Sequence, residues 1–320
     1  MFNVRNQPVY LIALFAAAML QSAAHAAAPM VRTSAPGFHR MILGDFEITV
    51  VSDGTVGLPM GSLLTNITPN DVNKAFARSF IKDPVETSVN AFVVNTGTKL
   101  VMIDTGAGDL FGPTLGNLLT NLTAAGYQPE QIDEIYITHM HGDHVGGLIA
   151  NNKPAFPNAV VRADRRDADF WLSKEKMEAA SADTKDFFKG AMMMINPYLT
   201  AGRFKPFSGD TDLVPGVKAI ANYGHTPGHT IYSIESKGER LVLWGDLMHV
   251  AAVQFPNPAV TIKFDSDSKE ASAQRRKAFA DAARGGYWIG AAHLPFPGIG
   301  HLRAEGRGYA YVPANYSIVR

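Results

Sequence analysis

One short segment constrains this chain more than any other part of its sequence. Residues 137–144 read Ile-Thr-His-Met-His-Gly-Asp-His and follow directly on a predicted apolar strand. Alternation along an extended backbone places the first two histidines on one side, and the glycine turn lets the last two polar side chains point elsewhere. A site for two neighbouring metal ions needs ligands that point in two directions, as these do. The four candidate ligands are His139, His141, Asp143 and His144.

The amino-acid composition decides which atoms could bind a metal. The 320 residues include no cysteine, which excludes disulfides, thiolate ligands, iron–sulfur clusters bound by cysteine and thiol nucleophiles. Imidazole nitrogens and carboxylate oxygens remain, a donor set that suits Zn²⁺. Three further candidates each follow an apolar strand. They are His225 in Gly-His-Thr-Pro-Gly-His, Asp246 in Leu-Trp-Gly-Asp and His293 in Ala-Ala-His.

Strands and helices alternate along most of the chain. Residues 45–51 alternate apolar and polar side chains and predict a strand that ends in a turn at residues 52–54. Residues 164–177 predict a helix with Asp164 as its N-cap. Because strands followed by helices recur in both halves, we expect an α/β protein folded as an αββα sandwich, two mixed sheets with outer helices.

The first 26 residues differ from the rest. Arg5 precedes an apolar run, and Ala24-His25-Ala26 fits a cleavage site, so residues 1–26 are predicted to be a secretory signal peptide. A membrane anchor is the alternative, but about 13 apolar residues fall short of the roughly 20 that span a bilayer. We therefore expect a periplasmic or secreted protein without a stable membrane anchor, whose residues 27–320 form one domain.

The charge balance argues against a nucleic-acid partner. Lysine and arginine together number 29, as do aspartate and glutamate, so the formal net charge is zero. Proteins that bind polyanions carry an excess of positive charge. A small-molecule partner is the better expectation.

The order of the seven candidate ligands resembles the metallo-β-lactamase superfamily, whose signature is H-x-H-x-D-H followed by a later His, an Asp and a final His. The resemblance implies that His139, His141 and His225 bind one metal, that Asp143, His144 and His293 bind a second, and that Asp246 bridges both. In that family the ligand precedes Thr-x-Gly-His, which favours His225 over His229. Asp104 matches a position that orients a ligand, although capping of a turn is an alternative role for it.

A narrower resemblance covers nearly the whole chain after residue 26. Residues 32–37, 43–49, 111–116 and 296–301 are similar to methyl parathion hydrolase and related lactonases. In that family Phe111, Trp171 and Phe188 would form the aromatic wall of the substrate pocket, while core packing is the alternative for each. The resemblance also implies a possible homodimer.

Four positions depart from the organophosphate-degrading members of that family. Those members have proline where Gly142 stands, and smaller or more flexible residues where His249, Ile262 and Phe264 stand. The last three are therefore further candidate substrate-binding residues. A narrower pocket with an extra imidazole suits a flat ester or lactone better than a tetrahedral phosphotriester.

The resemblance implies hydrolysis with two divalent metals, most simply Zn²⁺. Two metals about 3.5 to 4 Å apart can share a hydroxide and lower the pKa of its parent water toward 7, so a nucleophile exists at neutral pH. Asp143 or Asp246 would accept its proton, and His249 would hydrogen-bond the leaving oxygen. We expect a hydrolase of lactones or aryl esters, such as dihydrocoumarin, with secondary activity on organophosphate triesters.

Several alternatives stay open. The principal one is a methyl parathion hydrolase whose main substrate is a phosphotriester. A single-iron sulfur dioxygenase of the same fold is disfavoured because Asp143, His144 and His293 supply a full second site. A non-enzymatic binding protein would be expected to lack at least one ligand, and none is missing from the signature.

Overall fold

The computed structural model describes residues 28, 30–31 and 34–317. The chain divides into two units, residues 1–35 and 36–320, and every described helix and strand belongs to the second. The predicted signal peptide, residues 1–26, lies outside the described residues. No helix in the described part of the chain is both long and apolar enough to cross a membrane.

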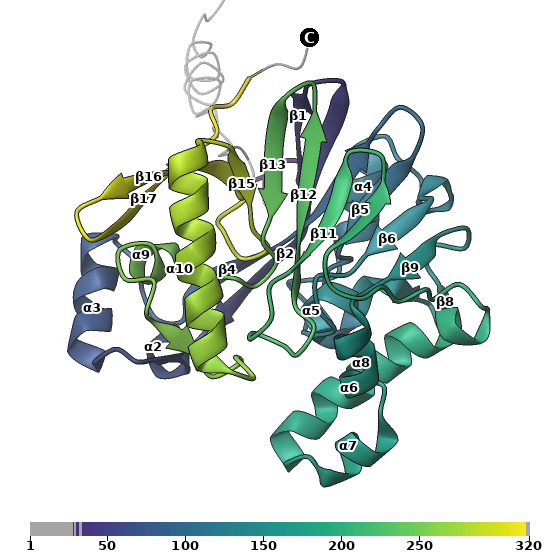
Figure 1. Ribbon diagram of the computed structural model, residues 1–320, viewed down its shortest axis with the longest axis horizontal. Coiled ribbons are helices and arrows are strands. Elements are labelled where there is room, and N and C mark those ends of the chain that lie inside the picture. Colours follow the sequence, from purple (N-terminus) through teal and green to yellow (C-terminus); the bar gives the residue numbers. More distant parts are fainter. Residues whose placement is uncertain (1–27, 29, 32–33, 318–320) are drawn as a thin grey trace, which may run out of the picture. The chain divides into compact units, whose positions relative to one another are not determined.

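Two mixed sheets form the centre of the second unit (Figure 1). The first sheet has the order β1-β2-β4-β5-β6-β9, with β5, β6 and β9 parallel. Its strands are β1 (Phe38–Leu43), β2 (Phe46–Leu58), β4 (Val85–Asn95), β5 (Leu100–Ile103), β6 (Glu134–Tyr136) and β9 (Val160–Arg162).

The second sheet has the order β10-β11-β12-β13-β15-β16-β17, with β13 and β15 parallel. Its strands are β10 (Thr211–Val214), β11 (Val217–Ala221), β12 (Thr230–Ser236), β13 (Glu239–Leu243), β15 (Trp288–Gly290), β16 (Ile299–Glu305) and β17 (Gly308–Pro313). Two small ladders pair β3 (Leu64–Thr65) with β14 (Thr261–Ile262), and β7 (Ile149–Ala150) with β8 (Lys153–Pro154).

The helices occupy the connections between strands. They are α2 (Met60–Leu63), α3 (Pro69–Arg78), α4 (Leu118–Ala124), α5 (Gly142–Val145), α6 (Arg165–Trp171), α7 (Lys174–Ala179), α8 (Ala182–Thr200), α9 (Ala251–Gln254) and α10 (Ser268–Gly285). Three 3₁₀ turns complete the set: η1 (Gly108–Leu110), η2 (Pro129–Gln131) and η3 (Gly146–Leu148).

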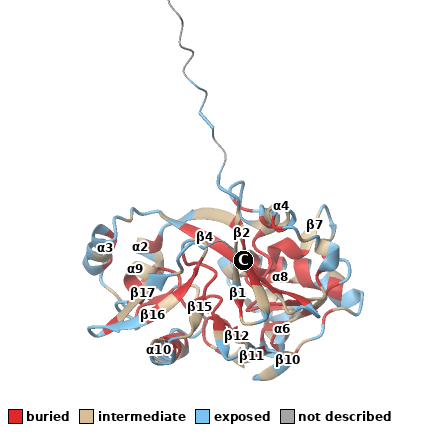
Figure 2. Cartoon of the chain, turned by 90° about the horizontal axis from the view of Figure 1, so that it is seen from above, coloured by how far each residue is buried: buried red, intermediate tan, exposed pale blue. Residues whose placement is uncertain are grey.

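Three apolar layers explain this arrangement. Val94 of β4 packs with Tyr232 of β12 between the two sheets. Val93, on the opposite face of β4, packs against α4 and α8, and Val242 of β13 packs with Phe279 of α10 outside the second sheet. Successive strand residues point to opposite faces, so a strand buried on both sides is apolar along its length. Figure 2 shows this burial along β4, in contrast to the exposed residues of α3. The predicted αββα sandwich is confirmed.

Two local predictions were wrong. Residues 52–54 do not end a strand, because β2 continues through them with a shift of register between Ser52 and Gly54. Gly54 adopts a φ of 130°, and a Cβ there would lie 2.1 Å from the carbonyl oxygen of Thr114. The shift of register makes residues 52–54 a β-bulge, and the bulge requires glycine at position 54 because a side chain would not fit that backbone.

The second wrong prediction is the single helix over residues 164–177. Its N-cap is confirmed, because the Asp164 side chain accepts a hydrogen bond from the backbone N–H of Arg166. The helix stops at Trp171, however, and Ser173 caps a new helix, α7, by accepting the N–H of Lys176. A second capping side chain thus divides the predicted helix in two.

Candidate metal centre

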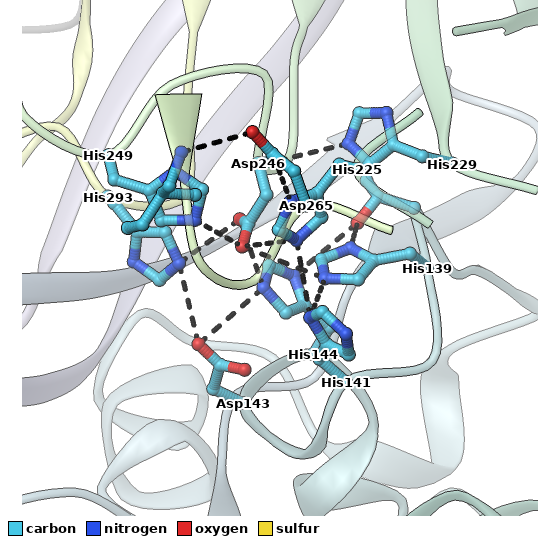
Figure 3. Close-up of polar contacts among 12 residues, drawn as sticks. His139, His141, Asp143, His144, His225, His229, Asp246, His249, Asp265 and His293 are labelled. Atoms are coloured by element: carbon cyan, nitrogen blue, oxygen red, sulfur yellow. Dashed lines mark hydrogen bonds and ion pairs between the residues drawn. The ribbon is translucent and has the colours of Figure 1, made fainter. Parts of the chain in front are cut away.

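The seven candidate ligands meet where strands of both sheets end (Figure 3). The loop after β6 in the first sheet carries His139, His141, Asp143 and His144. The loops after β11, β13 and β15 in the second sheet carry His225, Asp246 and His293. The structure thus brings together all seven residues that the sequence singled out.

The first group comprises His139, His141, His225 and Asp246, all of them buried. One atom from each lies within 4.8 Å of the others. Nδ1 of His141 lies 3.0 Å from Nε2 of His139 and 3.2 Å from Nε2 of His225. Oδ2 of Asp246 lies 3.3 Å from Nε2 of His225. Three imidazole nitrogens and one carboxylate oxygen therefore surround a single point.

The second group comprises Asp143, His144, Asp246 and His293. Oδ1 of Asp246 lies 3.1 Å from Nε2 of both His144 and His293. Oδ2 of Asp143 lies 3.4 Å from Nε2 of His293. Asp246 thus directs one oxygen to each group, which is the geometry of a bridging carboxylate.

Buried atoms in both groups fit divalent metals. Nε2 of His144 and Oδ1 of Asp246 have no hydrogen-bond partner among the described residues, although both are inaccessible to solvent. A buried polar atom without a partner is costly, and a metal ion would remove that cost. The nitrogen and oxygen donors without thiolate match Zn²⁺ and similar ions.

The pKa values of these side chains are shifted by burial and by the charged groups that face them. Burial alone would raise the pKa of Asp246, but the facing imidazoles of His144 and His293 hold it well below its usual range. Burial alone would lower the pKa of His225, but Asp246 and Asp265 outweigh it and raise that pKa to about 9. Burial lowers the pKa of His139. Protons and metal ions compete for such nitrogens.

Three of the candidate imidazoles, those of His144, His225 and His293, are oriented through Nδ1. Nδ1 of His144 lies 2.8 Å from Oδ2 of Asp104, and Nδ1 of His225 lies 2.9 Å from Oδ1 of Asp265. Nδ1 of His293 lies 2.9 Å from the carbonyl oxygen of Ser88. Contacts of this kind fix the tautomer and leave Nε2 free to bind a metal. Asp104 thus contacts a candidate ligand, as the resemblance implies.

His229 has a different task from His225. Its Nδ1 donates to the carbonyl oxygen of Asn222 at 3.0 Å, and its Nε2 accepts the backbone N–H of Asp246 at 3.1 Å. Both nitrogens are therefore used, and burial lowers the pKa of His229 to about 3. Gly245, the residue before Asp246, has a φ of 53°, and a Cβ at Gly245 would lie 3.0 Å from Nε2 of His229. Only glycine lets the two loops approach this closely.

Asp167 of α6 connects two of the ligand-bearing loops. Its Oδ2 accepts the backbone N–H of Met140 at 2.9 Å, and its Oδ1 accepts the N–H of Gly228 at 2.6 Å. Met140 lies between two candidate ligands, and Gly228 lies three residues after His225. One buried carboxylate therefore sets the spacing of the loops.

The predicted aromatic wall is only partly at the surface of a pocket. A pocket of about 250 Å³ beside the metal loop is lined by Phe111, Gly142 and Phe187, among others. Trp171 is 3% exposed and lies edge-on to His141, with ring centroids 5.3 Å apart. Phe188 packs within the core at 1% exposure. Phe187, which the sequence did not single out, lines this pocket, and Phe188 does not.

The other predicted substrate residues cluster on the second-sheet side. Nε2 of His249 lies 3.1 Å from Oδ2 of Asp246, and the His249 ring lies 6.1 Å from that of Phe264. Ile262 is fully buried in the cluster against which Phe264 packs. Of the three, only His249 has a recorded contact with a candidate ligand.

Sequence reasoning missed Asp167 and Asp265. A rule that metal-binding imidazoles are oriented by carboxylates predicts that such partners exist. With 29 acidic residues in the chain, that rule alone could not select these two. Their positions depend on how α6 and the loop before α10 pack against the sheets.

Comparisons with known proteins agree with this geometry. An N-acyl homoserine lactonase from a Bacillus species is 29% identical over 156 residues, which cover 49% of this chain and 54% of the lactonase. This chain thus spans about half the length of the curated relatives that it matches.

Two solved structures are similar over most of the chain. The hydrolase AbOPH of the beta-lactamase superfamily is 38% identical, with a TM-score of 0.85 and coverage of 89% of this chain and 100% of that one. AidC, a dizinc quorum-quenching lactonase, is 26% identical, with a TM-score of 0.81 and coverage of 88% and 99%. Residues 84–299 match the Metallo-beta-lactamase superfamily. With this match, the two-sheet fold and the seven converging side chains, the chain belongs to that superfamily.

Proposed function

We propose that this protein is a dinuclear, metal-dependent hydrolase whose preferred substrates are lactones or aryl esters. The observation that carries the proposal is the position of Asp246, whose two oxygens face two separate groups of imidazole and carboxylate donors. A site for one ion would need only one such group. Seven ligands arranged in this way hold two ions, for which we propose Zn²⁺.

The residues divide the work between binding and proton transfer. His139, His141 and His225 would hold the first ion, Asp143, His144 and His293 the second, and Asp246 both. When bound, two such ions lower the pKa of a water molecule and polarise the oxygen of the bond to be broken. Asp143 is the most exposed carboxylate of the set, with 24% of its side chain accessible. It is therefore best placed to take up a proton and pass it to solvent.

Support for a lactone comes from the relatives and from the pocket. The relatives named above include N-acyl homoserine lactonases and a dizinc quorum-quenching lactonase. In this chain the His249 imidazole stands beside the Asp246 carboxylate, and its ring lies 6.1 Å from that of Phe264. A carbonyl is planar and becomes tetrahedral only during attack, whereas a phosphotriester is tetrahedral from the start and carries two alkoxy groups. Bulk near the reacting atom therefore disfavours the phosphotriester.

A side-by-side rate measurement tests the proposal. The zinc-loaded protein is assayed with an aromatic lactone such as dihydrocoumarin, with an N-acyl homoserine lactone and with a methyl phosphotriester. We expect the higher kcat/KM for one of the lactones and weaker turnover of the phosphotriester. A protein that prefers the phosphotriester would instead be an organophosphate triesterase. Absence of turnover of all three by protein with two bound metals would contradict the proposal.

A further inference from the structure

A buried arginine lies beneath the candidate metal centre. Arg275 of α10 is fully buried, and its Nε donates to the carbonyl oxygen of Leu247 at 2.6 Å. Its Nη1 donates to the carbonyl oxygens of Val260 at 2.5 Å and Pro258 at 3.3 Å. A guanidinium is permanently charged, so its complete burial requires compensating partners.

The compensating charge is Asp265. Nη2 of Arg275 lies 3.9 Å from Oδ2 of Asp265, and both side chains are almost completely shielded from solvent. The same Oδ2 accepts the backbone N–H of Ile262 at 3.2 Å, while Oδ1 lies 2.9 Å from Nδ1 of His225. One carboxylate thus contacts a candidate ligand, the backbone of Ile262 and a buried cation.

These contacts join three segments that surround the first metal group. Leu247 directly follows Asp246, the bridging candidate. Val260 and Ile262 belong to the segment that carries Phe264. Asp265 orients His225 (Figure 3). On the other side of the centre, the corresponding carboxylate, Asp104, is held by the backbone N–H and the hydroxyl of Thr138 instead.

We propose that Arg275 and Asp265 are a positioning pair that strengthens metal binding at the His139–His141–His225 group and holds the adjoining segment, residues 260–264, in place. The inference rests on the proposed dinuclear site. A negatively charged acceptor on Nδ1 makes an imidazole a stronger ligand through Nε2. Arg275 places a buried positive charge 3.9 Å from Asp265 and ties the backbone beside Asp246 to the same anchor.

The proposal predicts different effects on the two metal groups, whereas a purely structural role predicts the same effect on both. Removing the charge of Asp265 should weaken the first group alone, because His144 and His293 have other partners. Loss of packing or of the fold would weaken both groups together. The difference is measurable without any substrate.

The test compares Asp265→Asn and Arg275→Gln with the natural protein. Metal-free proteins are titrated with Co²⁺ while the visible absorption spectrum is followed, and the two Zn²⁺ dissociation constants are measured by competition with a chelator. Arg276→Gln is the matched control, since Arg276 is the next residue of α10 and, among the described residues, hydrogen-bonds only to Ser272 of the same helix. Thermal unfolding of the metal-free proteins reports their stability.

We expect Asp265→Asn to weaken one metal site by about 10- to 100-fold and to leave the other unchanged. Its Co²⁺ spectrum should change at the first equivalent or at the second, but not at both. Arg275→Gln should reproduce the direction of this effect, and the double variant should lose less than the sum of the two, because the residues act as one unit. Arg276→Gln should bind both metals normally.

Two results would overturn the proposal. One is normal affinity at both sites in Asp265→Asn, with only a lower melting temperature. The other is an equal loss at both sites. If Arg275→Gln fails to fold, Asp265→Asn still decides the question, because asparagine retains the shape of the side chain. The readout is metal affinity, so a protein that binds two metals yet does not hydrolyse lactones would defeat the proposed function without affecting this result.

Discussion

The backbone N–H of Asp246 donates to Nε2 of His229 at 3.1 Å, so the second histidine of the Gly-His-Thr-Pro-Gly-His repeat holds the loop of the bridging residue rather than facing the metals. The first histidine, His225, directs Nε2 toward Asp246 Oδ2. Two histidines four residues apart therefore perform separate tasks.

This separation predicts opposite phenotypes for the two alanine variants. His225→Ala should reduce the number of bound metals from two to about one, because it removes a ligand. His229→Ala should retain the metals but lower the free energy of unfolding by about 1–3 kcal/mol, since the N–H of Asp246 loses a buried partner. Elemental analysis and denaturant unfolding check the two effects. The reverse order of metal loss would show that His229 is the ligand.

Asp246→Asn removes one unit of negative charge at the point shared by both groups. We expect metal content to fall and kcat/KM to decrease by several orders of magnitude. Asp212→Asn, at an exposed position of β10, serves as the control for loss of a carboxylate. If Asp246→Asn retained activity within about tenfold, or 1.4 kcal/mol of barrier, the bridging role would be refuted.

Removal of metal should leave the fold intact. Asp104, Asp265 and Asp167 hold the ligand loops by hydrogen bonds that do not involve a metal. After treatment with a chelator we therefore expect an unchanged far-ultraviolet circular dichroism spectrum, no hydrolysis and a lower melting temperature. A metal in hundredfold excess over its Kd contributes about 2.7 kcal/mol by mass action. Addition of Zn²⁺ should restore activity, and unfolding on chelation would contradict the expectation.

The side chains around Asp246 and His249 should govern the choice between lactone and phosphotriester. His249→Leu, Ile262→Thr and Phe264→Leu together remove the imidazole beside Asp246 and loosen the packing around it. We expect the ratio of the two kcat/KM values to move toward the phosphotriester by at least about tenfold. Because the three side chains are neighbours, the combined effect should differ from the sum of the single effects. An unchanged ratio in the triple variant would refute the steric argument.

The location of the protein remains a prediction from residues 1–26. Cell fractionation followed by N-terminal sequencing should recover the chain from the periplasm, beginning near Ala27. Cleavage after the A-x-A sequence that ends at Ala26 would leave Ala27 as the first residue of the mature protein. An intact Met1 in the recovered protein would be inconsistent with export by this signal.

The sequence was most informative where chemistry and spacing coincide. His139, His141, Asp143 and His144 follow one strand within one loop, so local geometry sufficed to group them.

It was least informative where long-range packing decides. Phe187 and Phe188 are adjacent aromatic residues, and only the rotation of α8 against the first sheet determines which of them reaches the pocket. The turn predicted at residues 52–54 failed for a similar reason. The buried Asp53 side chain accepts N–H groups from Ala107, Gly116 and Leu118, all more than fifty residues away. Contacts of that range leave no local pattern.

The division of the ligands between the two sheets has a consequence for how the protein matures. Each metal group draws two of its four members from the loop after β6 and two from loops of the second sheet. Neither half of the chain by itself carries a complete coordination sphere. A nascent chain in which only one sheet has formed therefore offers each metal group only two of its four members, so we expect both groups to be complete only after the halves have docked. The bound ions would then cross-link the two sheets, and they would do so only after the sheets have docked correctly.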